Sequence, residues 1–111
     1  YLKSHSYHWS EAERHHNRSI WLYHVRKVTE FLIKYGEYFE AIQLNHHVQE
    51  INPLLEESYL TLMKLYHYVD DKDAVQQQYE LLQRVLKEEL AVEPDHKIKK
   101  WYKEWQSKII N

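Results

Sequence analysis

The sequence predicts an all-α fold built from antiparallel helix hairpins, and three observations point to it. The 111 residues include one glycine and two prolines, so few positions favour tight turns or interrupt a helix. Apolar residues recur at spacings of three and four along most of the chain, and no segment alternates as a strand would. Displacing the sequence by 34 residues also brings similar positions into register, which predicts repeated helix pairs.

The first predicted helix spans residues 11–35. Ser10 and Glu13 form a capping-box pattern at its start. Gly36, the single glycine of the chain, follows the last apolar residues and suits the left-handed conformation that commonly terminates a helix. The apolar face of this helix is expected to comprise Trp21, Val25, Val28 and Leu32.

The second and third predicted helices span residues 38–51 and 54–68. Pro53 separates them, because the residue before a proline is disfavoured in the helical conformation and proline itself suits the first turn of a helix. The residues expected to point inward are Tyr38, Ala41, Ile42 and Val48 in the second helix, and Tyr59, Leu62, Met63 and Tyr66 in the third.

The fourth predicted helix spans residues 72–90, and a fifth follows the loop "AVEPD". Asp70 or Asp71 can cap the fourth helix, and Asp95 can cap the fifth. The inward residues are expected to be Val75, Tyr79, Leu82 and Leu86 in the fourth helix, and Ile98, Trp101, Tyr102, Trp105 and Ile109 in the fifth.

The 34-residue displacement places Gly36 on Asp70 and, upstream, Val28 on Leu62. Helix, turn and helix with this period are typical of the tetratricopeptide repeat (TPR). The stretch "GEYFEA" is similar to the turn of that repeat, and its alanine, Ala41, is expected to be small where the two helices cross. We therefore expect about two TPR-like hairpins in a right-handed α-α superhelix, with the fifth helix as a C-terminal cap.

The order of several motifs resembles that of a known family. "NPLLEESYLTLMKLY", "QQYELLQRVLKEEL" and "VEP" follow one another as in the bacterial transcriptional activation domain, a TPR-like domain of SARP-type activators and related response regulators. Upstream, "YLKSHSYHWSEAERHHNRSIWL" resembles the entry segment of that family, so the resemblance covers essentially the whole chain. The family usually has glycine where Asp70 and Ala91 stand and Ser-Pro where Asp95 and His96 stand, differences that affect turns and caps.

The resemblance implies that residues 1–111 form a single domain, a fragment of a longer regulator with a DNA-binding winged helix, with or without a receiver domain, upstream. The chain would then be a protein–protein interaction domain of a SARP-like activator or of a two-component response regulator in phosphorelay signal transduction. It would mediate self-association or interdomain docking and so couple a signal to DNA binding by the adjacent domain. The alternative is a stand-alone TPR-type peptide-binding scaffold outside transcription, and the identity of the upstream domain separates the two.

Composition argues against several other functions. The formal net charge of −2 does not suit a domain that grips phosphates, so DNA contact is expected only through an adjacent domain. The chain has no cysteine and no apolar run long enough to span a membrane, which fits a cytoplasmic location. Adjacent histidines such as His46 and His47 point to different sides of a helix, and neither a glycine-rich phosphate loop nor a nucleophile elbow is present. We expect no enzyme activity, metal site or cofactor.

The candidate binding surface is the concave groove that the first helix of each hairpin lines in TPR-like stacks. Helical phase predicts that its residues are Tyr23, Arg26, Glu30 and Ile33 from the first helix, and Glu57, Leu60, Lys64 and His67 from the third. This mixture suits a protein partner: another copy in a homodimer, an upstream receiver or winged-helix domain, or the transcription machinery.

Two aromatic segments lie outside this groove. In the entry segment, Tyr1, Tyr7 and Trp9 are the candidate interdomain or dimer contacts. In the fifth helix, "KIKKWYKEWQSK" mixes lysines with aromatic residues, as single-stranded nucleic-acid sites do. Because Trp101 and Trp105 share a stripe with Ile98, we interpret them as core or interface residues and the lysines as the solvated face.

Overall fold

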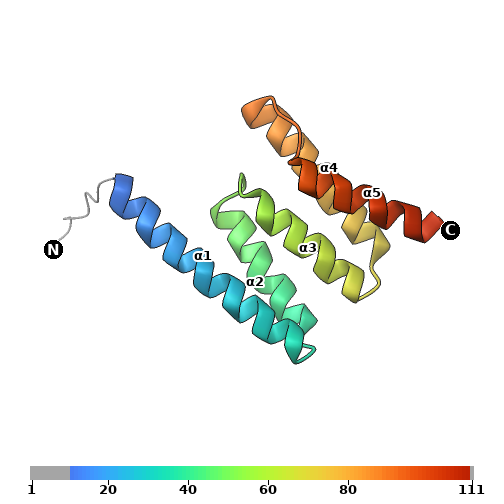
Figure 1. Cartoon of the computed structure of the whole chain (residues 1–111), viewed down its shortest axis with the longest axis horizontal. Helices are drawn as coiled ribbons and strands as arrows, with labels where there is room; N and C mark the ends of the chain where they lie inside the picture. The colour runs from blue at the N-terminus through green and yellow to red at the C-terminus, as the bar shows by residue number, and fades with distance from the viewer. Residues whose placement is uncertain (1–10, 111) are drawn as a thin grey trace.

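The computed structural model describes residues 11–110, and the side chains of residues 19–109, as an arrangement of helices alone (Figure 1). The helices are α1 (Glu11–Lys34), α2 (Tyr38–Ile51), α3 (Glu56–Tyr68), α4 (Lys72–Leu90) and α5 (His96–Ile110). No strand occurs between residues 11 and 110. The predicted all-α fold of helix hairpins is therefore confirmed.

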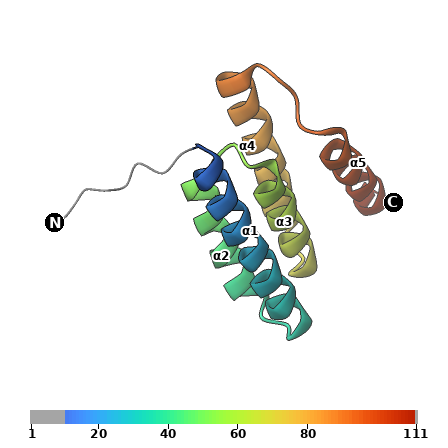
Figure 2. The ribbon, with the colours of Figure 1, turned by 60° about the vertical axis from the view of Figure 1, so that its left-hand side comes forward.

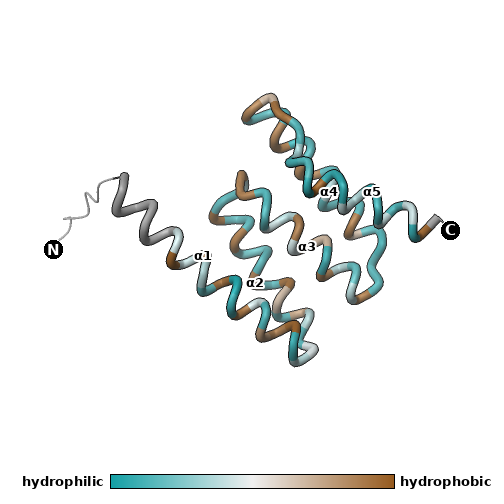
Figure 3. Tube along the Cα trace, in the orientation of Figure 1, coloured by the Kyte–Doolittle hydropathy of each residue, from teal (hydrophilic) through white to brown (hydrophobic). Residues whose placement is uncertain are grey.

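The helices pack as two neighbouring hairpins and a terminal helix. α1 packs on α2, α2 on α3, and α3 on α4, so the second hairpin follows directly from the first. Figure 2 shows α5 on the opposite side of the second hairpin from α1 and α2. Hydrophobic stretches recur at intervals along the packed helices, as the hydropathy colouring in Figure 3 shows. The fifth helix therefore lies against the second hairpin, after the two repeats, as predicted.

The two hairpin turns have the same backbone structure at positions 34 residues apart. Gly36 and Asp70 both have a left-handed conformation, with φ of 76° and 61°. In each turn, the N–H groups of this residue and the next one donate to carbonyl groups three and five residues earlier, at 2.7–3.0 Å. Asp71 then caps α4, since its carboxylate accepts a hydrogen bond from the N–H of Ala74 at 3.1 Å. The sequence repeat is therefore a repeat of turn geometry.

A third left-handed residue, Ala91, ends α4 with φ of 55°. Here the N–H of Ala91 donates to the carbonyl of Lys87 at 3.2 Å and the N–H of Val92 to that of Leu86 at 3.4 Å, so the hydrogen bonds differ from those of the two hairpin turns. Asp70 and Ala91 therefore occupy the two positions where the resembled family usually has glycine. A side chain with a Cβ atom strains the backbone in this conformation.

The start of α3 differs from the prediction. The sequence placed its first residue at position 54, just after Pro53, whereas the helix begins at Glu56. Residues 52–55 form a turn instead, in which the N–H of Leu55 donates to the carbonyl of Asn52 at 3.1 Å. The Tyr59 hydroxyl donates to the carbonyl of Pro53 at 2.7 Å and holds this turn against α3. The helix therefore begins after this turn, two residues later than predicted.

The first part of the core lies where α2 packs against α3. Ala41 and Ile42 of α2 form a cluster with Leu62 and Leu65 of α3, and Ala41 is fully buried. The partly buried residues packed against this cluster are Leu32, Ile33, Tyr38, Tyr66 and Val69. The small side chain of Ala41 therefore lies at a crossing shared by α1, α2 and α3.

The second part of the core joins α3, α4 and α5 through aromatic rings. Tyr79 of α4 stacks on Tyr102 of α5 with ring centroids 3.9 Å apart and planes inclined by 7°. Trp105 continues this stack, at 5.6 Å from the Tyr102 ring. Burial raises the pKa of both tyrosines, because it disfavours the charged phenolate. The inward face predicted for α5 is correct for Ile98, Tyr102 and Trp105, all of which are buried.

Two residues predicted to be inward are exposed. Val28 lies on the outer face of α1, away from the helices that pack on it, and Ile109 lies at the end of α5 beyond the aromatic stack. Helical spacing alone assigned Val28 to the face that also holds Val25 and Leu32. The face of α1 that packs on α2 and α3 is narrower than this spacing suggests, and Val28 lies outside it.

We predict that Ala91→Gly raises the free energy of unfolding by about 1 kcal/mol. A left-handed residue with a Cβ atom costs roughly 1–2 kcal/mol, and the greater backbone entropy of glycine in the unfolded chain offsets part of the gain. Urea unfolding followed by circular dichroism measures the change. Ala74→Gly, inside α4, is the control and should have the opposite sign, by about 0.5–1 kcal/mol. A lower stability for Ala91→Gly would contradict the assigned turn.

We predict that Ala41→Trp lowers the free energy of unfolding by at least about 1–3 kcal/mol. The site is fully enclosed by α1, α2 and α3, and overpacking such a contact forces side chains or helices apart. Thermal unfolding measures the loss. Gln43→Trp, at an exposed position of the same helix, is the matched control and should leave the melting temperature nearly unchanged. Equal melting temperatures for the two variants would refute the crossing at Ala41.

Candidate functional site

A groove of about 330 Å³ lies between α1 and α3. These are the first helices of the two hairpins, α2 supplies the groove floor, and the beginning of α5 reaches one edge. The apolar residues that line it are Leu22, Val25, Ile33, Val48, Leu55 and Leu60. The polar and aromatic residues that line it are Arg26, Thr29, Glu30, Asn45, Glu57, Thr61, Lys64, Tyr68 and Lys97. The groove therefore has apolar walls beneath a charged rim.

Most of the residues predicted to face the groove do so. The six that line it are Arg26, Glu30, Ile33, Glu57, Leu60 and Lys64. Their spacings of three and four within each helix keep them on one side, as the helical period requires. Their position in the groove follows from the structure, whereas the binding role predicted for them stays a prediction.

Two predicted residues lie outside the groove. Tyr23 is exposed on α1, with the Lys27 ammonium 5.5 Å from its ring centroid. His67 lies toward α5, where its ring meets Trp101 edge-on at 6.4 Å. Each residue lies at the edge of the helical face that was assigned to the groove. A small rotation of the helix about its axis determines whether a residue at this edge faces the groove or another part of the surface. Tyr1, Tyr7 and Trp9 lie outside the described residues.

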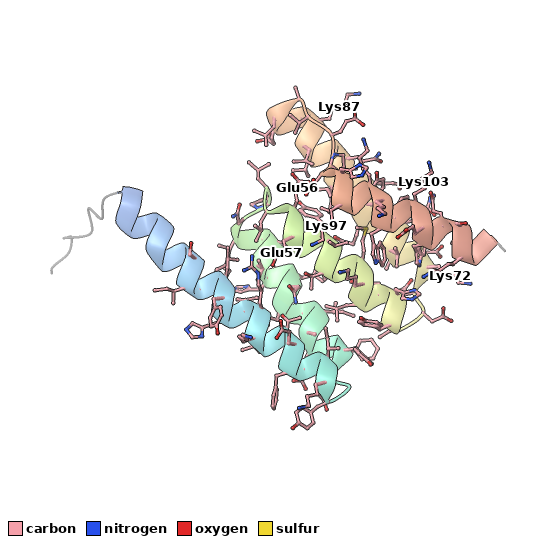
Figure 4. All side chains as sticks on the ribbon, viewed as in Figure 1. Glu56, Glu57, Lys72, Lys87, Lys97 and Lys103 are labelled. Atoms are coloured by element: carbon pink, nitrogen blue, oxygen red, sulfur yellow. The ribbon has the colours of Figure 1, made fainter. Side chains whose placement is uncertain are left out.

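Nine lining residues were not among those predicted for the groove: Leu22, Val25 and Thr29 of α1, Asn45 and Val48 of α2, Leu55 just before α3, Thr61 and Tyr68 of α3, and Lys97 of α5. Asn45 and Val48 form part of the floor from α2, and Lys97 reaches the edge from the first turn of α5. Helical phase places residues within one helix but says nothing about which other helices approach it. In Figure 4, Lys97 lies near Glu57, whereas Lys72, Lys87 and Lys103 lie away from the groove.

One ion pair connects α1 to α3 across the groove. The Arg26 guanidinium donates two hydrogen bonds to the Glu57 carboxylate, of which the Nη2–Oε1 bond measures 2.7 Å. This bond raises the pKa of Arg26, because the neighbouring carboxylate favours the charged guanidinium. Both side chains remain about half exposed to solvent. Exposed pairs contribute roughly 0–1 kcal/mol to stability, so a partner could replace this pair at little cost.

Two further cations of the groove have no such carboxylate. Among the residues that the structure describes, neither Lys64 nor Lys97 forms an ion pair, whereas Glu30 lies 3.8 Å from Lys27. The ammonium groups therefore remain available to an incoming acidic group. Because they stand beside apolar walls, the groove can receive apolar and acidic side chains together.

The polar floor is satisfied internally. The buried side-chain amide of Asn45 donates from Nδ2 to the Thr29 hydroxyl at 3.1 Å and to the Ala41 carbonyl at 2.8 Å. Thr29 is also buried, so these bonds join α1 to α2 beneath the groove. Buried polar groups without partners are costly, and this pairing avoids that cost. The floor is thus a structural element that fixes the distance between the two helices.

Two kinds of feature are absent among the described residues: a metal-binding cluster and a membrane-spanning helix. Across the described part of the chain, no three histidine, aspartate or glutamate side chains gather as a metal site would require. None of the described helices combines the length and the apolar character needed to cross a membrane. The groove has the mixture of apolar and charged surface that is common in protein–protein contacts.

The chain matches one protein family over most of its length. The model of one family, described as the bacterial transcriptional activator domain, matches residues 1–105. This range includes every residue of the groove. No curated protein and no solved structure matches the chain.

We predict that Asn45→Ala lowers the free energy of unfolding by about 1–3 kcal/mol, because it leaves the buried Thr29 hydroxyl without its partner. Glu57→Gln is the comparison on the rim and should cost less than about 1 kcal/mol. Urea unfolding of both variants gives the two values. If Glu57→Gln lowered the free energy of unfolding as much as Asn45→Ala, the rim would be as important for stability as the floor. That result would contradict the interpretation that only the floor is needed for stability.

Proposed function

The chain belongs to the bacterial transcriptional activator domain family, and on this premise we propose that it is the protein-binding, regulatory domain of a bacterial transcription regulator. The match over residues 1–105 confirms the resemblance seen in the sequence and connects the chain to transcription activation. The finer assignment, docking of a protein in the groove between α1 and α3, is our proposal. It involves no catalytic step and no cofactor.

The groove supports this proposal by its chemistry. Lys64 and Lys97 stand free of ion pairs with described residues, beside apolar walls that include Leu60 and Ile33. A protein segment that carries apolar and acidic side chains would bury the first against the walls and pair the second with the lysines. Such a mixture of a hydrophobic centre and a polar rim is typical of protein interfaces.

The proposed mechanism is a change of docking that alters the activity of an adjacent domain. The groove partner would be a second copy, an upstream receiver or winged-helix domain, or the transcription machinery. DNA would be contacted by the winged helix and not by this chain, whose formal net charge is −2. Contacts through Tyr1, Tyr7 and Trp9, a homodimer, phosphorelay control and a cytoplasmic location belong to the same proposal. A ligand shifts such an equilibrium only by its difference in affinity for the two states.

The alternative is a TPR-type scaffold that binds peptides outside transcription. It would use the same groove, so groove geometry does not separate the two functions. The family to which the chain belongs is defined by transcription activation, and this favours the regulator.

We predict that Lys64→Glu in the full regulator reduces transcription of its target genes several-fold. The substitution places a carboxylate in the groove, where it would repel an acidic partner group and compete for Arg26. Target genes are those whose transcripts change when the regulator gene is deleted, and RNA sequencing of the variant strain measures the effect. Circular dichroism of the purified domain checks that the fold persists.

Lys87→Glu is the matched control, because it makes the same charge change on α4, outside the groove. It should leave the target transcripts at wild-type levels. If Lys64→Glu also left them unchanged, the groove would not be the regulatory surface. If deletion of the gene changed no transcripts while the purified chain still bound peptides in the groove, the scaffold alternative would replace the regulator.

A further inference from the structure

One carboxylate of the groove binds one of the groove's own cations. Arg26 of α1 and Glu57 of α3 both line the groove. The guanidinium donates two hydrogen bonds to the carboxylate, from Nε to Oε2 and from Nη2 to Oε1, the second at 2.7 Å. Arginine commonly binds a carboxylate through paired bonds of this kind, including the carboxylate of a partner molecule. Glu57 therefore occupies the acceptor position that an acidic ligand would take.

This ion pair crosses the groove from one wall to the other. The other ion pairs among the described residues lie within α1 and between α5 and the loop before it. The pair of Arg26 and Glu57 is thus the one that connects α1 to α3. A protein segment that lies along the groove between these two helices must meet both side chains.

The pair can open without disturbing the shape of the groove. Its two side chains have exposed fractions of 52% and 44%, and exposed ion pairs contribute little to stability. The groove floor is held separately, because the buried Asn45 amide donates to the Thr29 hydroxyl at 3.1 Å and so joins α2 to α1. α1 therefore keeps its place on α2 when Arg26 releases Glu57.

The charges of the groove leave room for one more carboxylate. The charged residues that line it are three cations, Arg26, Lys64 and Lys97, and two carboxylates, Glu30 and Glu57. The groove thus has one excess positive charge, although the whole chain has a formal net charge of −2. Lys97 lies near Glu57 in Figure 4 and forms no ion pair with a described residue, so it can receive Glu57 when another carboxylate binds Arg26.

We propose that Glu57 is an internal competitor for the acidic group of the groove's partner. Glu57 holds Arg26 until an acidic protein segment enters the groove. A carboxylate of that segment then binds Arg26, and Glu57 turns toward Lys97. The exchange lowers the affinity for every acidic segment by the strength of the internal pair, and it selects against neutral segments, which cannot replace Glu57. This inference rests on the proposed function, since it requires that an acidic protein segment binds in the groove.

The test uses a short peptide in which leucine and aspartate alternate, and a second peptide with asparagine in place of every aspartate. Chemical shifts of the isotopically labelled chain, followed by NMR during each titration, give the location of binding and the dissociation constant. We expect the acidic peptide to shift the resonances of groove residues saturably. Glu57→Gln should lower its dissociation constant about two- to fivefold, because a neutral amide binds the guanidinium less strongly than a carboxylate does. The asparagine peptide should show no such gain.

Two further variants separate a direct exchange from a general effect of charge. Glu30→Gln removes the same charge from the same groove, but Glu30 contacts Lys27 at 3.8 Å, so its gain should be smaller than that of Glu57→Gln. Arg26→Gln should weaken binding of the acidic peptide, and the addition of Glu57→Gln to this variant should give no gain. Such a double-mutant cycle isolates the coupling between the two residues. Circular dichroism confirms that each variant is folded.

The outcomes separate this inference from the proposed function. If the acidic peptide shifts no groove resonances of the folded wild-type chain, both are wrong. If the peptide binds in the groove and Lys64→Glu weakens it, but Glu57→Gln brings no gain, the proposed function stands and the competitor role of Glu57 is wrong. A gain that Glu30→Gln matches, or that persists without Arg26, would also overturn the competitor role.

Discussion

The structure depends on the burial of α3 from both sides. Tyr59, Leu62, Met63 and Leu65 have exposed fractions of at most 1%, although they belong to a helix of 13 residues. Leu62 and Leu65 pack toward α2, whereas Tyr59 and Met63 pack toward α4 and α5. Full burial of such side chains is worth about 1.5–3 kcal/mol each. Neither hairpin could keep its position relative to the other without this shared helix.

The position of the groove follows from this arrangement. Because two sides of α3 are occupied, only its remaining strip, with Glu57 and Lys64, is free to face α1 and line the groove. On the far side of the second hairpin, the aromatic rings of α5 cover α4. α1 packs mainly on α2, and Val28 and Phe31 on its outer face are exposed.

The sequence predicted the features that depend on local structure and period. Most helix boundaries, the turn at Gly36 and its counterpart at Asp70, and six groove residues follow from local sequence and from spacing along single helices. The differences come from features that spacing does not reveal. Val28 was assigned to the core because spacing does not show how wide a face of α1 packs on its neighbours. α3 begins later than predicted, after a turn to which Tyr59 donates a hydrogen bond.

α1 is held to the rest of the domain by few contacts, and this matters for the groove. Arg26 and Ile33 face the groove, whereas Val28 and Phe31 lie on the exposed outer face of the helix. The links of α1 to the rest of the domain are its packing on α2, the bonded pair of Thr29 and Asn45, and an exposed ion pair that contributes little. A ligand in the groove would contact both α1 and α3, so its binding would add a link between these two helices.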